Sequence, residues 1–180
     1  MDYRQYYDLE NYLVTTVNKR FHDLGYLSAF DFFCIVIWKA NRAKSKVAKR
    51  LLIKYPRNIK NAVRELTSFI FQKQSEKEKL SCLINIWGFR IPMASAILTI
   101  LYPDEFTIYD ARVCDSLESF HNIAKITNFE RLRREYQKYK QVVIESAPSM
   151  YSLRDKDRYL WGKSFKKQLE GDIKEKFIMK

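Results

Sequence analysis

Apolar and polar residues alternate along this chain with the period of α-helices. Apolar residues recur every four positions from Leu9, and the pattern stops near Gly25, which predicts a helix over about 6–22. Ser28 and Asp31 have the spacing of a capping box and precede the run FFCIVIWKA, which is apolar on nearly every face. We therefore expect a central buried helix to follow the first one.

Three further helical segments follow along the chain. Residues 58–74 continue the helical pattern, and a long charged helix is expected between Asn128 and Pro148. The segment 150–171 is again amphipathic, and we expect a basic tail after Gly171. All of these segments have the period of helices, and none has the strict alternation of strands.

A helix-hairpin-helix is predicted at about residues 76–101. Ser75 and Glu78 form a capping box, and the apolar periodicity that follows ends at Gly88, a residue suited to the positive φ of a helix end. Pro92 fits the first turn of a second helix, where its missing N–H costs nothing. The N–H groups and positive dipole end of this second helix would offer a site for one DNA phosphate.

The segment after the hairpin contains a candidate helix cap. Residues 106–109 read as extended, and Asp110 stands at the N-cap of a short helix that runs to about residue 117. The chain has only 4 Gly and 4 Pro in 180 residues, whereas folds made of strands need frequent turns. The predicted fold class is therefore all-α.

Composition limits the class of protein. A chain of 180 residues with 47% hydrophobic and 30% charged residues fits one globular unit, which we place at residues 1–180. No apolar run has the length of a membrane span, and the charged N-terminus has no leader-like apolar region, so we expect a cytoplasmic protein. The three cysteines are widely spaced, so we expect no metal site, no metal cluster and no cofactor.

The net charge of +12 implies an anionic partner, most often nucleic acid. The strongest positive block, residues 39–60, has nine basic and no acidic residues. It is either a solvated helix face or a series of phosphate contacts. Within or beside it, we assign Lys39, Arg42, Lys44 and Lys46 to DNA contact.

The stretch WGFRIPMASAILTILYPDEFTIYDARV, about 15% of the chain, resembles the hairpin-to-aspartate signature of the helix-hairpin-helix DNA glycosylase superfamily. Trp38-Lys39, PMASAILTILYP, Asp110 to Arg112 and DRYLW at 157–161 are together similar to a poorly characterised bacterial group with an 8-oxoguanine-glycosylase-like fold. This resemblance implies two small helical lobes around a cleft and a DNA partner whose target nucleotide is flipped out of the duplex.

The resemblance transfers only in part. Gly88 matches the first hairpin glycine, but Arg90 stands where a second glycine is usual, and Pro92 occupies the place of the Schiff-base lysine of bifunctional members. Lyase chemistry from position 92 is therefore excluded. Asp110 matches the catalytic aspartate, and a carboxylate alone suffices for a monofunctional enzyme.

The resemblance and the residue types together give a set of candidate site residues. Asp110 is the candidate catalytic residue, although an aspartate before a helix is often only a structural cap. Trp38 and Trp161 could line a base pocket by stacking or could be core residues. The remaining candidate DNA contacts are the hairpin residues Gly88, Phe89, Arg90, Pro92 and Met93, together with Arg112.

Three functions stay open at this point. The first is a monofunctional glycosylase that acts on a damaged or modified base. The second is a DNA-binding module that kept the fold without the chemistry, and the third is a helical adaptor with an acidic protein partner. The position of Asp110 separates them: a cleft with aromatic walls and basic flanks favours the enzyme.

Overall fold

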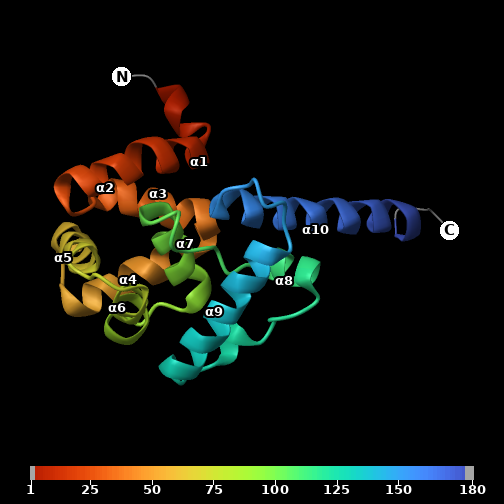
Figure 1. The fold of residues 1–180 in the computed structure, drawn as a ribbon. Helices are drawn as coiled ribbons and strands as arrows, with labels where there is room; N and C mark the ends of the chain where they lie inside the picture. Colours follow the sequence, from red (N-terminus) through yellow and green to blue (C-terminus); the bar gives the residue numbers. More distant parts are fainter. Residues whose placement is uncertain (1–2, 177–180) are drawn as a thin grey trace.

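The computed structural model describes residues 3–176, and every regular element in that range is a helix (Figure 1). The all-α prediction is confirmed. The α-helices are α1 (Leu9–Tyr12), α2 (Asn18–Leu24), α3 (Ala29–Ala40), α4 (Lys44–Lys54), α5 (Ile59–Phe71), α6 (Glu76–Ser81), α7 (Ile91–Leu101), α8 (Ala111–Leu117), α9 (Phe129–Glu145) and α10 (Leu153–Glu175). Shorter helical turns lie at Tyr3–Tyr6, Leu13–Val17, Asn41–Ala43, Cys82–Ile86 and Ile123–Lys125.

The first predicted helix is present as a nearly continuous rod over residues 9–24. The π-helical turn Leu13–Val17 joins α1 to α2. Asp8 caps the start of the rod by accepting a hydrogen bond from the N–H of Asn11, and Gly25 ends it with a φ of 74°. The N–H of Gly25 donates to the carbonyl of Phe21 at 2.8 Å, as expected for a left-handed C-cap.

The second predicted helix, α3, is present and is buried over part of its surface. Ser28 caps it, since its side chain accepts a hydrogen bond from the N–H of Asp31 at 3.1 Å. Phe32, Ile35 and Val36 of the apolar run are buried, whereas Ile37 is 38% exposed, and Phe30, which precedes the run, is 57% exposed. The buried part of α3 contacts several elements, among them α4, α5 and α7.

The helix-hairpin-helix begins and turns where the sequence predicts. Ser75 and Glu78 form the complete capping box of α6, and a π-helical turn, Cys82–Ile86, extends this helix toward the hairpin. Gly88 has a φ of 67°, and α7 then starts with Pro92 in its first turn. Helix α7 is the central element of the molecule, because nearly all of its side chains are buried.

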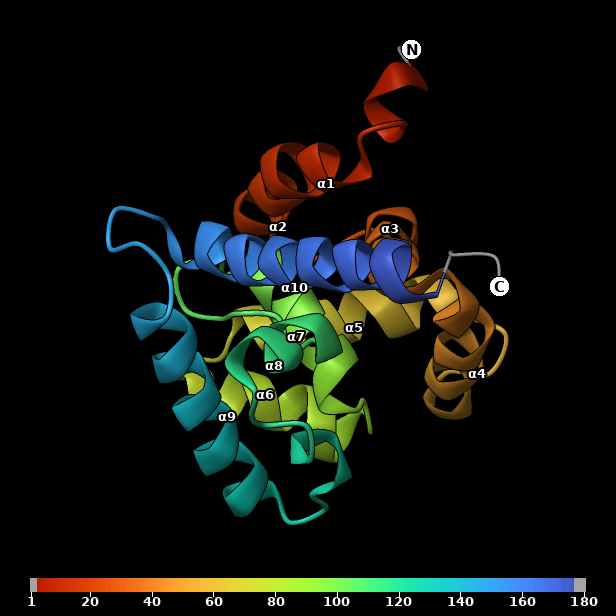
Figure 2. The ribbon, with the colours of Figure 1, turned by 90° about the vertical axis from the view of Figure 1, so that its right-hand side faces the viewer.

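The C-terminal third of the described chain forms a helical corner. Helix α8 lies in the angle between α9 and α10, and contacts link α10 to both (Figure 2). Helix α10 is longer than expected: it continues through Gly171 to Glu175, so the basic segment after Gly171 begins as helix rather than as a tail. Its C-terminal half extends away from the body of the molecule (Figure 1).

Buried side chains from α1 to α10 form one contiguous hydrophobic cluster. The extended segment 106–109 crosses this cluster, with the side chains of Phe106 and Thr107 fully buried. The hydroxyl of Tyr136 donates to the carbonyl of Thr107 at 2.6 Å, and that of Tyr139 donates to the carbonyl of Ile108 at 2.7 Å. These bonds fix the backbone immediately before Asp110.

Candidate functional site

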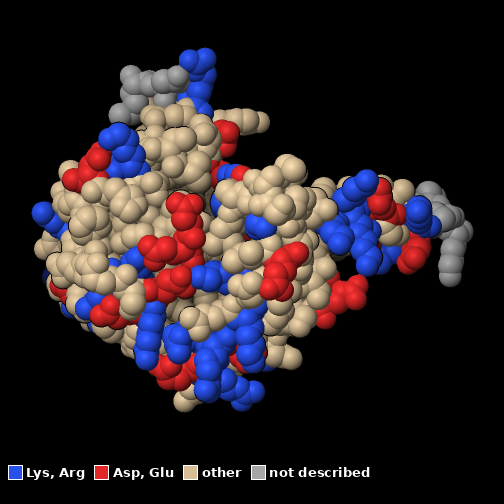
Figure 3. Space-filling view, viewed as in Figure 1, with Lys and Arg blue, Asp and Glu red and all other residues tan. Residues whose placement is uncertain are grey.

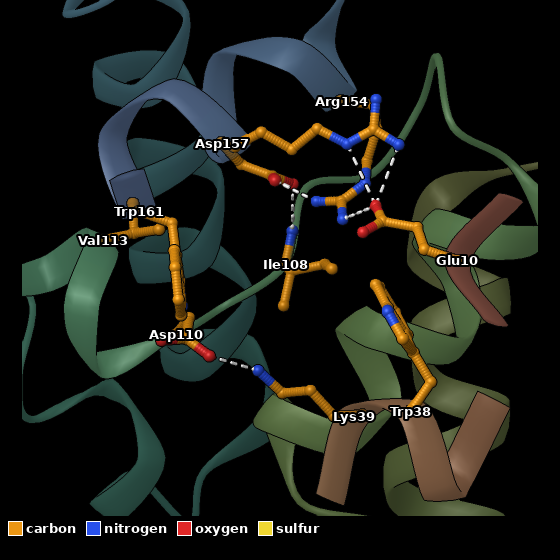
Figure 4. Close-up of a pocket in the computed structure, with 10 residues that line it drawn as sticks. Glu10, Trp38, Lys39, Ile108, Asp110, Val113, Arg154, Asp157 and Trp161 are labelled. Carbon is orange, nitrogen blue, oxygen red and sulfur yellow. Dashed lines mark hydrogen bonds and ion pairs between the residues drawn. The ribbon is translucent and has the colours of Figure 1, made fainter. Parts of the chain in front are cut away.

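A pocket of about 340 Å³ opens where α3, α8, α10 and the segment 106–110 meet (Figure 4). Its volume lies within the range of small-molecule sites, about 300–1,000 Å³. The pocket combines aromatic, acidic and basic side chains from distant parts of the sequence. It is lined by Glu10, Trp38, Lys39, Ile108, Asp110, Val113, Arg154, Asp157, Arg158 and Trp161.

Asp110 divides its carboxylate between the fold and the pocket. Oδ1 accepts a hydrogen bond from the N–H of Arg112 at 3.0 Å, which caps α8. Oδ2 lies 2.5 Å from Nζ of Lys39, and the two side chains are 26% and 13% exposed. The aspartate is therefore a helix cap and also a pocket residue, so the two interpretations of the sequence do not exclude each other.

Lys39 lies in the pocket, across from Asp110, rather than on an open phosphate-binding face. It is the penultimate residue of α3, so the direction of this helix points its ammonium group at the start of α8. Figure 4 shows the pair along one side of the pocket. The structure thus joins two residues that are 71 positions apart in the sequence.

Trp38 and Trp161 stand on opposite sides of the pocket (Figure 4). Trp38 is half-buried beneath the guanidinium of Arg154, whose Cζ lies 5.3 Å from the centre of the indole ring. Trp161 is 42% exposed and stacks on Phe165 one helical turn further along α10. Both rings are therefore accessible from the pocket, and neither is a sealed core residue.

Glu10 and two arginines form the polar wall opposite the Lys39–Asp110 pair (Figure 4). Arg154 donates to Oε1 of Glu10, and Arg158 donates to the same oxygen at 3.0 Å through Nε. Burial alone would raise the pKa of Glu10, but the two guanidiniums outweigh it and hold the pKa below its usual value. Glu10 is therefore ionised near neutral pH.

Asp157 lies at the back of this wall and is 2% exposed. Its carboxylate accepts hydrogen bonds from Arg154, from the hydroxyl of Thr107 at 3.2 Å and from the N–H of Ile108 at 3.3 Å. Burial raises the pKa of Asp157 to about 6, against the opposing effect of Arg154. The residue thereby ties α10 to the extended segment that carries Asp110.

Sequence reasoning missed Glu10 and Arg154 as pocket residues. Arg154 bridges Glu10 and Asp157, and 144 positions separate it from Glu10. No spacing rule connects residues so far apart in an irregular helical fold. Asp157 and Arg158 belong to the DRYLW stretch that carries the family resemblance, which was the available signal for this part of the pocket.

The hairpin residues lie outside the pocket lining. Gly88 and Arg90 are exposed, and Pro92 and Met93 are half-buried. Phe89 is only 4% exposed, and its N–H donates to the carbonyl of Leu83 at 2.8 Å, so it presents neither its ring nor its amide at the surface. The N–H of Met93 donates to the carbonyl of Arg90, which leaves few free amides at the start of α7.

The basic block 39–60 is divided between the solvent and the hairpin. Arg42, Lys44 and Lys46 are exposed, as phosphate contact requires. In contrast, Arg50 lies 5.9 Å from the ring centre of Phe89, and the ammonium of Lys54 lies 4.6 Å from the ring of Trp87. Part of this positive charge therefore packs on the hairpin.

A second group of cations, absent from the candidate list, lies on α9. Figure 3 shows Lys and Arg side chains gathered near the lower edge of the molecule, where Figure 1 places this helix. Some of them are paired: Arg133 contacts Glu130, and Lys140 contacts Glu76. The group contains Arg131, Arg133, Arg134, Lys138 and Lys140.

Arg112 lies beside the pocket rather than in its lining. Its Nη1 donates to Oε1 of Gln168 at 2.8 Å. The guanidinium carbon lies 5.1 Å from the ring centre of Trp161 and 5.4 Å from that of Phe165. Arg112 therefore supports the outer face of the Trp161 wall.

Within residues 3–176 no cluster of His, Cys, Asp and Glu has the composition of a metal site. The free cysteines Cys34, Cys82 and Cys114 are buried, and burial raises the pKa of each thiol to about 11. No helix in the described range is long and apolar enough to cross a bilayer.

Comparison with known proteins gives no relative: no family model, curated protein or solved structure matches this chain.

Proposed function

We propose that this protein is a DNA glycosylase that releases a damaged or modified base from a nucleotide flipped into the pocket. The single observation that carries the proposal is the position of Asp110, at one side of a pocket with two tryptophan walls and three basic residues. A pocket of this kind is what the glycosylase hypothesis requires, whereas a non-catalytic module could have this aspartate buried in the packing between helices.

Each part of the pocket has a role in that reaction. Trp38 and Trp161 stack on the extruded base, which offsets part of the cost of unstacking it from the duplex. Cleavage of the bond between base and sugar develops positive charge on the deoxyribose. The carboxylate of Asp110 stabilises this charge and orients the water that attacks C1′, while the bond electrons leave with the base.

Binding to the duplex rests on the exposed cations. Arg42, Lys44 and Lys46 neutralise phosphates, and the hairpin from Gly88 to Met93 adds a further phosphate contact. Because Phe89 is buried and Pro92 has no N–H, the contact from the hairpin relies on Arg90 more than on backbone amides.

The decisive experiment is base release from duplexes that carry oxidised, deaminated, alkylated or phage-type modified bases. For a substrate that is cleaved, Asp110→Asn lowers single-turnover release by about 10²–10³, because it removes the charge that stabilises the transition state. The asparagine oxygen still caps α8, so the fold is kept. Asp115→Asn, an exposed change on the same helix, is the control.

Release that is undiminished in the Asp110→Asn variant refutes the role of Asp110. The absence of release from every duplex refutes the glycosylase.

The second candidate is a DNA-binding module without catalysis. One observation favours it: Oδ2, the oxygen of Asp110 that faces the pocket, is taken by Lys39 at 2.5 Å. Tight, steeply salt-dependent binding to DNA without any turnover identifies such a module.

A further inference from the structure

We propose that Lys39 is an amine nucleophile for the sugar aldehyde of an abasic site, so that the protein also cleaves the DNA strand there. The inference rests on the proposed function, in which base release leaves such a sugar at this pocket. It adds a second activity, and it assigns that activity to a residue on α3 rather than on the hairpin.

Lys39 differs from the other cations of the pocket. Arg154 and Arg158 are both bonded to Glu10, and a guanidinium is not a nucleophile at neutral pH. The side chain of Lys39 is 13% exposed, and its ammonium group contacts Asp110. The pocket therefore holds a single primary amine, opposite an aromatic wall.

The neighbour of Lys39 is the group that a nucleophilic lysine needs. At 2.5 Å, Oδ2 of Asp110 can accept a proton from the ammonium and leave a lone pair on Nζ. The second carboxylate oxygen stays bonded to the N–H of Arg112, so the aspartate keeps its orientation during the transfer. The amine of Lys39, the carboxylate of Asp110 and the N–H of Arg112 thus form a chain of contacts, in which they serve as nucleophile, base and anchor of the base.

The chemistry balances without a cofactor. Nζ adds to the aldehyde carbon C1′, and the carbonyl oxygen leaves as water, which gives a protonated imine. Removal of a C2′ proton then expels the 3′ phosphate with the electrons of the C3′–O bond. Water finally hydrolyses the imine and regenerates Lys39, so nothing is oxidised or reduced overall.

Position 92 cannot supply this amine, because a proline stands there. The amine comes instead from the C-terminal end of α3, where Lys39 lines the pocket. Sequence spacing alone assigned Lys39 to phosphate contact, so the activity follows only from the tertiary structure.

The test uses a duplex that already contains an abasic site, incubated with the full-length protein and borohydride, which reduces an imine to a stable amine. The expected result is a one-to-one covalent protein–DNA adduct, with strand cleavage 3′ to the abasic site when borohydride is omitted. Peptide mapping of the adduct by mass spectrometry places the DNA on Lys39.

Two variants separate nucleophilicity from charge. Lys39→Arg keeps a cation opposite Asp110 and is expected to reduce adduct formation at least about 100-fold while DNA affinity changes little. Lys19→Arg, an exposed lysine on α2 that pairs with Asp23 and lies outside the proposed DNA contacts, is expected to leave the adduct unchanged. No adduct with the wild type, or equal adduct with Lys39→Arg, overturns the proposal.

A rescue guards against a folding defect. Lys39→Cys followed by treatment with bromoethylamine rebuilds an amine at the same position, and the three native thiols are buried and protected. Recovery of the adduct after this treatment supports the assignment. Adduct formation by Lys39→Cys before treatment counts against it.

Failure of this proposal differs from failure of the proposed glycosylase. Base release with no adduct on abasic DNA refutes only the amine chemistry. An adduct on abasic DNA without release from any base-bearing duplex refutes the glycosylase and leaves a lyase.

Discussion

Asp157 makes the stability of the protein depend on pH in a direction opposite to that of most carboxylates. Its pKa is raised from 3.8 to about 6 in the folded protein by burial. Between these values the folded state binds more protons than the unfolded state. Protonated Asp157 therefore adds stability below about pH 4, and this contribution is lost as the pH rises through 6.

The magnitude follows from the two pKa values. A difference of about 2 units corresponds to about 3 kcal/mol at full effect, and about 1.4 kcal/mol of this is lost between pH 5 and pH 7.5. The pKa values of Glu10, Glu78 and Asp155 are instead lowered by their hydrogen-bond and ion-pair partners. The stability that these three carboxylates contribute is lost only as the pH falls through their lowered pKa values.

The assay is urea unfolding followed by far-ultraviolet circular dichroism at pH 5, 6, 7 and 7.5. We expect the free energy of unfolding of the wild type to fall by about 1.4 kcal/mol relative to Asp157→Asn over this range, because the variant has no group to titrate. Asp155→Asn, an exposed change on the same helix, is expected to keep the wild-type slope. Parallel pH profiles of the wild type and Asp157→Asn would refute the raised pKa.

Four further predictions concern the helix-hairpin-helix, helix α10 and the basic block. Gly88→Ala is expected to lower the free energy of unfolding by about 1–2 kcal/mol, because φ is 67° there and a Cβ would lie 2.5 Å from Nη1 of Arg50. Gly171→Ala places a Cβ that meets nothing within 4 Å in a helix interior, so it should raise the free energy of unfolding by up to about 1 kcal/mol. A lower melting temperature in this variant would contradict a helix at residue 171. Ser75→Ala removes the capping box of α6 and should cost about 1 kcal/mol in chemical denaturation, whereas an unchanged midpoint would show that the cap contributes nothing. Lys46→Ala should reduce the slope of log affinity for DNA against log salt by about 1 in fluorescence anisotropy, and an unaltered slope would remove this residue from the DNA interface.

The fold was predictable where the signal is local. Caps at Ser28, Ser75 and Asn128 and the positive φ at Gly88 depend on residues a few positions apart, and each is present. The extent of α10 was not predictable from Gly171, because neighbouring helix formers override a single glycine. The burial of α3 also depended on which helices pack against it.

The candidate site was predictable only as separate residues. The sequence by itself determined that Asp110 caps a helix after an extended segment, and it marked Trp38, Lys39 and Trp161 as residues of interest. Only the tertiary structure decided that these four line one pocket, and that Lys39 faces Asp110 rather than a phosphate. The physical reason is the separation in sequence of the residues that interact. Caps and turns are set by bonds over three or four positions, whereas the pocket depends on how α3, α8 and α10 pack around one core.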